Sequence, residues 1–208
     1  AWGEAKFKAL GFDKVTLEPA TFAKWERGVE TAEILAPYPQ PLAITALGKS
    51  IPTPKEGITG EVIHFATLAD LQSADPALIK GKITFISNRM SRQKDGSGYG
   101  QAVGARGTAA QVTAAKGGIG TVIRSIGTDN DRLPHTGAMK HDHDVPTVPA
   151  GALSNPDADL LVNMLKRGKP VSLKYTLGSN FAGNYTSHNV IGDIIGSEKP
   201  KEYVIIGC

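Results

Sequence analysis

The chain carries ITFI at Ile83–Ile86, AVGARGTAAQVTAAK at Ala102–Lys116 and IGTVIRSI at Ile119–Ile126, and this stretch decides the fold. The first and last segments are apolar runs of strand length, and the alanine-rich segment between them predicts a helix that ends at Gly117–Gly118. It is the one clear strand–helix–strand unit in the sequence. A sheet with helices between all of its strands is therefore not expected.

The remaining periodic segments predict more strands than helices. Further helices are expected at Ala1–Leu10, Leu68–Gln72 and Asp157–Arg167, the last with Pro156 in its first turn and Ser154 or Asn155 as its N-cap. Strands are expected at Val15–Glu18, Phe22–Trp25, Glu33–Leu35, Leu42–Leu47, Glu61–Phe65, Thr147–Val148, Gly151–Leu153, Val171–Thr176, Asn189–Ile195 and Tyr203–Ile206. This balance predicts a mixed α/β fold, with a mixed sheet or open β-barrel and flanking helices.

Composition excludes several classes of protein. The 208 residues are 40% hydrophobic, which is enough for a core and too much for a disordered chain. No apolar run approaches the ~20 residues of a membrane-spanning helix. The net charge is only +3 and the basic residues are scattered, unlike the dense basic stripe of a nucleic-acid binder. The nearest approach to a cluster consists of Arg89, Ser91, Arg92 and Lys94, and it is expected to be a solvated loop.

One motif could bind a metal ion. His141-Asp-His143-Asp144 places two histidines at strand spacing, and a His-x-His pair can share a zinc ion. A catalytic zinc needs three protein ligands, and no Glu or Cys close by in the sequence supplies the third. His135 is near, but its spacing to the pair decides nothing. The alternative, which we favour, is an exposed polar loop between Pro134 and Pro146.

Glycines crowd the segment before the alanine-rich helix, where glycine loops can hold phosphate groups. They are Gly96, Gly98, Gly100 and Gly104. Their register does not fit G-x-G-x-x-G, because Gln101 and Val103 stand where glycine is required, and no G-K-[ST] follows. The G-x-S-x-G motif of serine hydrolases is also absent, and Ser97 simply lies within the segment. A surface loop is expected here, and no complete active site.

The central segments resemble a protease-associated domain. Ile79–Ser87 is similar to the opening strand of such domains, and Gly104–Ser125 is similar to their alanine-rich helix and the strand after it. Val145–Ser154, the helix that follows and Gly168–Leu173 complete the same pattern. The resemblance implies a domain that lies over or beside a catalytic cleft, where it restricts access or helps to shape the substrate pocket.

The flanking segments are similar to the plasma glutamate carboxypeptidase family of co-catalytic zinc exopeptidases. The similarity is carried by Leu10–Pro19, Trp25–Gly28, Gly57–Val62 and His135–Gly137. It implies a secreted or periplasmic parent enzyme with two zinc ions that hydrolyses peptides or dipeptides. No signal peptide is visible in the 208 residues.

The last segments, Asn189–Ser197 and Tyr203–Cys208, resemble the first core strands of the zinc-peptidase domain. In that family the zinc ligands and the general-base glutamate come after these strands. The resemblance therefore implies that no residue of this chain is catalytic, cofactor-binding or metal-binding, and that the chain itself holds no cofactor. His141 and His143 then have no assigned role.

The expected organisation is an incomplete N-terminal peptidase segment at residues 1–44, a protease-associated domain at 45–178 and truncated peptidase strands at 179–208. The expected function is non-catalytic: substrate gating, pocket formation or protomer contact within a zinc metallopeptidase. Expected partners are the remainder of the peptidase domain, its peptide substrate and a second protomer, with no nucleic acid and no membrane span. The alternative is a free-standing protein- or peptide-binding module. A nucleotide-binding enzyme is disfavoured by the glycine register.

Overall fold

A computed structural model describes residues 2–140 and 144–207. The chain forms two compact units. One is continuous in sequence, Trp25–Phe181, and the other combines the two ends of the chain, Ala1–Lys24 and Ala182–Cys208. The middle of the chain is thus an insertion between two terminal segments that belong together.

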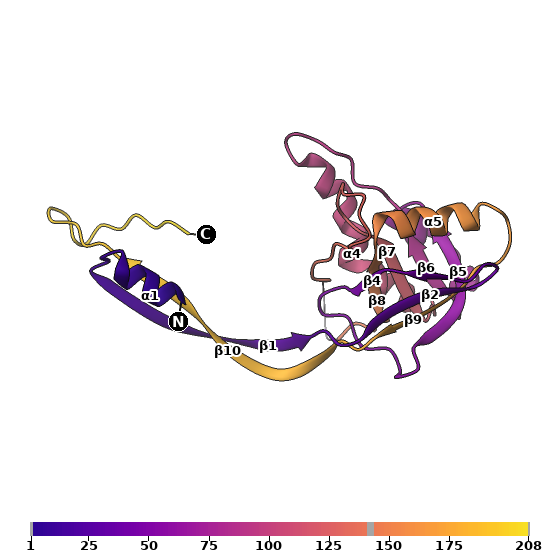
Figure 1. The fold of residues 1–208 in the computed structure, drawn as a ribbon, viewed down its shortest axis with the longest axis horizontal. Coiled ribbons are helices and arrows are strands. Elements are labelled where there is room, and N and C mark those ends of the chain that lie inside the picture. Colours follow the sequence, from indigo (N-terminus) through magenta and orange to yellow (C-terminus); the bar gives the residue numbers. More distant parts are fainter. Residues whose placement is uncertain (1, 141–143, 208) are drawn as a thin grey trace. The chain divides into compact units, whose positions relative to one another are not determined.

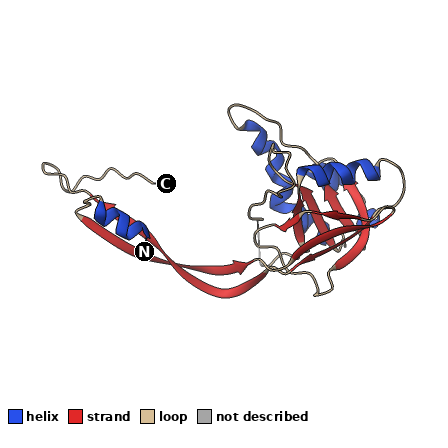
Figure 2. Cartoon of the chain, in the orientation of Figure 1, coloured by secondary structure: helices blue, strands red, loops and turns tan. Residues whose placement is uncertain are grey.

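The inserted unit is built on one eight-stranded mixed sheet (Figures 1 and 2). Its strands are β2 (Glu30–Ala36), β3 (Gln40–Leu42), β4 (Ile44–Ala46), β5 (Ile58–Phe65), β6 (Ile83–Ile86), β7 (Gly120–Arg124), β8 (Ala150–Leu153) and β9 (Ser172–Leu177). Their order is β3-β2-β9-β5-β6-β7-β8-β4. Strands β5 to β8 are parallel to one another, whereas the other pairs are antiparallel. The expected mixed α/β fold is confirmed.

The two edge strands of this sheet follow one another directly in the sequence, so the sheet is nearly closed. Strands β3 and β4 stand at opposite ends of the strand order, yet only Ala43 separates them. The Ala43 N–H donates to the Asp157 carboxylate at 2.8 Å instead of to a neighbouring strand. The prediction of one strand at Leu42–Leu47 was therefore wrong, because the chain changes strand at Ala43. Near-closure leaves little open edge for unwanted pairing.

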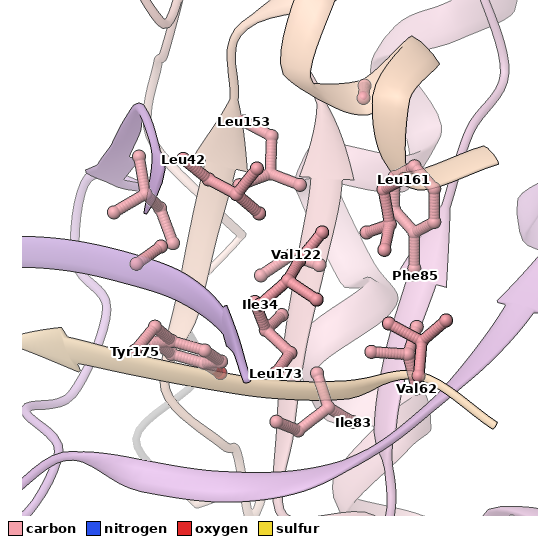
Figure 3. Close-up of a cluster of buried hydrophobic side chains, with 14 of the residues drawn as sticks. Ile34, Leu42, Val62, Ile83, Phe85, Val122, Leu153, Leu161, Leu173 and Tyr175 are labelled. Carbon is pink, nitrogen blue, oxygen red and sulfur yellow. The ribbon is translucent and has the colours of Figure 1, made fainter. Parts of the chain in front are cut away.

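The helices cover the two faces of this sheet, and each face has its own apolar cluster. Helix α5 (Asn155–Leu165) packs Ala158, Leu161 and Met164 into the cluster enclosed by the curved sheet, which Figure 3 shows around Phe85, Val122 and Tyr175. On the outer face, α2 (Leu68–Ser73), α3 (Pro76–Ile79) and the alanines of α4 (Ser97–Ala115) pack against Ile86 and Ile123. Alternate residues of β6 and β7 serve the two clusters, as strand geometry requires.

The strand–helix–strand unit is confirmed as β6-α4-β7, with parallel strands. Helix α4 begins at Ser97, not at Ala102, because the Asp95 carboxylate accepts the Ser97 N–H at 3.0 Å and Gly96 adopts a φ of 76° before it. A second parallel crossover, from β5 to β6, runs through α2 and α3. The sequence analysis missed α3, which has only four residues.

The prediction for α5 is confirmed apart from a small shift in its bounds. Ser154 is the N-cap, and its hydroxyl accepts the Asp157 N–H at 3.2 Å. The strand expected at Thr147–Val148 is absent, and β8 alone follows the long loop after β7.

The unit formed by the chain ends contains α1 (Trp2–Ala9) and most of the paired strands β1 (Lys14–Glu26) and β10 (Asn180–Asp193). The expected interruption at Pro19 was wrong: β1 is continuous, because a strand of a two-stranded ribbon has a free edge that needs no N–H donor. Tyr203–Ile206, expected as a strand, has no regular structure and no neighbouring strand among the described residues. No helix within residues 2–140 and 144–207 is long and apolar enough to cross a membrane.

Tyr175 fixes the spacing between β7 and β9 in the inserted unit. Its ring is fully buried, and its hydroxyl donates to the Pro149 carbonyl at 2.7 Å. Burial raises the pKa of this hydroxyl. The side chain fits only because Gly120 faces it, since a Cβ at position 120 would overlap the Tyr175 Oη and the Ile58 Cδ1.

We therefore expect Gly120→Ala to lower the free energy of unfolding by about 3 kcal/mol, the effect of overpacking a rigid core. The matched control is Gly100→Ala in α4, where no atom lies within 4 Å of an added Cβ. That change should stabilise by about 1 kcal/mol through helix propensity. Urea denaturation of both variants checks the prediction, and equal stabilities would contradict it.

Candidate functional site at the carboxyl ends of the parallel strands

The carboxyl ends of β5, β6, β7 and β8 lie along one edge of the sheet, because these strands run parallel. Two long loops and the N-terminus of α5 follow from this edge. The first loop consists of residues 87–96, and the described residues of the second loop are 125–140 and 144–149. In open α/β sheets, ligands bind outside the carboxyl ends of the strands. The polar side chains gathered there are therefore the first candidates for a functional site.

Arg124, the last residue of β7, organises this edge. Its side chain is 4% exposed, and its Nε donates to the Ser87 carbonyl at 2.9 Å. Its Nη1 donates to the Asn155 carbonyl at 3.1 Å and its Nη2 to Asp159 Oδ1 at 2.8 Å. Burial lowers the pKa of this guanidinium, and the bond to Asp159 opposes that effect. One side chain thus joins β6, β7 and α5.

Asp159 also holds the first of the two loops. Arg89 Nη2 donates to both of its carboxylate oxygens at 2.6 Å. Burial opposes ionisation of Asp159, but the hydrogen bonds from Arg89 and Arg124 lower its pKa overall. The basic loop is exposed, as expected, yet it is tethered: Arg92 also donates to Thr128 Oγ1 of the second loop at 3.4 Å.

His64 and Ser87 form a second polar contact at this edge. Their Nε2 and Oγ atoms are 2.7 Å apart, and the imidazole stacks on Phe85 with ring centroids 5.4 Å apart. Burial lowers the pKa of His64, and the charges of Lys166 and Arg124 act in the same direction. The imidazole is therefore held neutral at pH 7. Among the described residues no carboxylate orients its other nitrogen, as a nucleophile–base pair would require.

The sequence analysis named Arg89 and Arg92 as part of a solvated basic loop, but it singled out none of the other residues at this edge. Arg124, Ser87 and His64 share one readable signal, because each stands at or next to the carboxyl end of an apolar strand. Asp159 carried no signal, since it lies within a helix and its contact with Arg124 spans 35 residues.

Of the four crowded glycines, Gly96 precedes α4 and the other three lie within the helix. Gly96 takes the left-handed conformation that precedes the helix, and Gly98 lies directly against the Ser91 carbonyl, where no Cβ would fit. The Ser97 N–H is satisfied by Asp95. The segment is thus the first turn of a helix and the loop before it, and it does not bring the four glycines around a common point.

The histidine motif is only partly described. His141 and His143 lie outside the described residues. The exposed His135 is anchored through its backbone, whose N–H donates to Ser125 Oγ at 2.8 Å. Within residues 2–140 and 144–207, no group of three His, Cys, Asp or Glu side chains is placed to hold a metal ion.

The chain is similar in sequence to carboxypeptidase Q from several vertebrates. It is 35% identical to that of Xenopus laevis over 93% of the chain, 32% identical to that of Bos taurus over 98% and 31% identical to that of Homo sapiens over 94%. The chain spans only about two fifths of the length of these relatives, between 40% and 42%. No protein-family model matches it.

Solved structures agree with the sequence relatives. A Peptidase M28 precursor from Shewanella amazonensis has 49% identity and a TM-score of 0.92, over 95% of this chain and 45% of the other. An aminopeptidase from Aneurinibacillus, at 21% identity, shares the fold with a TM-score of 0.61 over 95% of this chain and 42% of the other. Over most of its length, the chain is thus a homologue of carboxypeptidase Q and of this M28 peptidase, and corresponds to less than half of either.

Proposed function

We propose that this chain is the non-catalytic, protease-associated part of a zinc metallopeptidase that hydrolyses peptides or dipeptides. The observation that carries the proposal is the insertion: Trp25–Phe181 forms one unit, while the segments before and after it belong to another. An inserted domain with its own filled core adds a surface to a host protein without supplying the host's core. Homology to less than half of a peptidase agrees with such an addition.

We propose that the protease-associated domain expected at residues 45–178 extends on its N-terminal side to residue 25, which leaves peptidase-domain segments at the two ends of the chain. Residues 25–44 pack with the inserted unit, because β2 pairs with β9 and the β3–β4 segment completes the sheet. The host part would thus be represented by α1 and most of β1 and β10.

The apolar residues of the C-terminal segment support the remainder of a peptidase domain as the partner. Val204, Ile205 and Ile206 are 94%, 90% and 93% exposed. Three consecutive β-branched residues suit a strand buried on both faces and not a solvated coil. Each would gain roughly 1.5–3 kcal/mol from full burial.

Zinc belongs to the proposed parent enzyme, where it would activate a water molecule for attack on a peptide carbonyl. The described residues of this chain do not fit a zinc site, since they offer no group of three ligands. No chemical step is therefore assigned to this chain. Its proposed contribution is to gate the peptide substrate, to shape its pocket or to contact a second protomer, in a secreted or periplasmic enzyme.

The second candidate is a free-standing binding module, favoured by the self-contained core of Trp25–Phe181. The exposed C-terminal apolar run favours the first candidate, because a free module has no use for it.

We expect the chain alone to hydrolyse no peptide. The test incubates the purified 208-residue chain with zinc and a panel of dipeptides and of N- and C-terminal reporter peptides. A known zinc exopeptidase serves as the positive control for the assay. Turnover that a chelator abolishes would contradict the non-catalytic assignment.

We expect the isolated chain to self-associate through its C-terminal apolar run. Replacing Val204 and Ile206 by Lys should make it more monomeric without loss of stability, because both side chains are already solvated. The matched control is Glu202→Lys, which adds the same two units of positive charge in the same exposed segment. Sedimentation velocity distinguishes the variants. The prediction fails if Glu202→Lys makes the chain monomeric to the same extent as the double variant.

A further inference from the structure

A groove of about 440 Å³ lies over the exposed side of α4, between the start of α2 and residues Ala138 and Lys140 of the second loop. Its lining combines apolar side chains with two cations and two glycines. They include Leu68, Val103, Gly104, Arg106, Ala138 and Lys140. A groove of this size accommodates one or two amino-acid residues of a peptide.

Arg106 lies in this groove as a half-buried charge that no described carboxylate neutralises. Its Nη2 donates to the Tyr99 hydroxyl, and its guanidinium lies 5.5 Å from the centroid of that ring. Within the described residues no carboxylate pairs with it, and its Nε has no hydrogen-bond partner. A charge partly withdrawn from water is costly unless an opposite charge accompanies it. The guanidinium is therefore suited to an anionic ligand.

The backbone around Arg106 is shaped to hold the guanidinium in place. A Cβ at Gly137 would lie 2.7 Å from Arg106 Cζ, so the loop backbone packs directly against the guanidinium. The Lys140 N–H donates to the Gly107 carbonyl at 3.0 Å, which anchors the loop along α4. Residues 104–107 of α4 and the His135–Gly137 segment thus meet at Arg106.

The apolar residues that line the groove determine which group the ligand carries beside its negative charge. Leu68 and Val103 are only partly buried against the outer apolar cluster, so each offers apolar surface to the groove. Glycine at position 104 keeps the floor open, since an added Cβ would contact Leu68 Cδ2 at 3.5 Å. A bare inorganic anion would leave this apolar surface exposed to water. A ligand with both a carboxylate and an apolar side chain would pair with Arg106 and also cover this apolar surface.

We infer that this groove binds the C-terminal residue of a peptide. Arg106 holds the free carboxylate, Lys140 adds a second positive charge, and Leu68, Val103 and Ala138 receive the apolar side chain. The inference deepens the proposed function, on which it rests for the choice of a peptide as ligand. It assigns to the accessory domain the recognition of free peptide C-termini.

The test uses amide chemical shifts of the full 208-residue chain during titration with N-acetyl-Ala-Leu. We expect the amides of Gly104, Gly107 and Ala138 to shift, and the peptide amide of the same sequence to bind about tenfold more weakly, because it lacks the charge. Arg106→Gln should abolish this preference. The matched control is Arg167→Gln, an exposed arginine outside the groove, which should leave it unchanged.

Three results would overturn the inference. The peptide acid and the peptide amide could bind with equal affinity, inorganic phosphate could cause the same amide shifts as the peptide, or Arg167→Gln could abolish the preference as Arg106→Gln does. Should Arg106→Gln fail to fold, as judged by amide dispersion, Lys140→Gln must instead weaken binding of the acid but not of the amide. If the peptide does not bind, only the inference about the groove is refuted. If the chain hydrolyses the peptide and a chelator abolishes this activity, the non-catalytic assignment is refuted. The two failures are therefore distinguishable.

Discussion

The carboxylate of Asp157 is the constraint on which the rest of the inserted unit depends. Asp157 is 4% exposed, and its carboxylate accepts the Ala43 N–H at 2.8 Å and the Ser154 hydroxyl at 2.7 Å. Arg132, from the second loop, pairs with it at 2.9 Å. The chain can therefore switch strands at Ala43 without leaving a buried donor unsatisfied, which would cost about 1–3 kcal/mol. One side chain joins the seam of the sheet, the start of α5 and a long loop.

Closure of the sheet at this seam has consequences for function. With its interior filled by apolar side chains, the unit encloses no site among the described residues, and its chemistry is confined to loops and outer surfaces. The carboxyl edge is used mainly for structure: Arg124, Asp159 and Arg89 bind one another and tether the loops. The groove beside α4 differs, because the charge of Arg106 is not neutralised by any described carboxylate. A surface of this kind suits recognition of an anionic ligand.

The sequence predicted the elements whose signals are local. The apolar run of β6, the capped start of α5 and the alanine-rich α4 were identified because propensity and capping agree there. Several of the errors come from partners distant in sequence. Pro19 is tolerated because β1 has a free edge, and the switch at Ala43 depends on a carboxylate 114 residues away. Tyr203–Ile206 has strand composition but no described neighbour to pair with. The functional class came from resemblance, whereas Arg106 could not be singled out before Gly137 was placed beside it.

Native-state hydrogen exchange on the 208-residue chain and on Asp157→Ala tests most directly whether this carboxylate closes an independently folded insertion. The amides to follow are Ala43 at the seam, Val62 in β5, and Asp13, whose N–H donates to the Asp193 carbonyl in the other unit. We predict that the substitution speeds exchange at Ala43 and Val62 by about 10- to 100-fold and leaves Asp13 unchanged. Unchanged exchange at Ala43, or an equal increase at Asp13, would contradict the account.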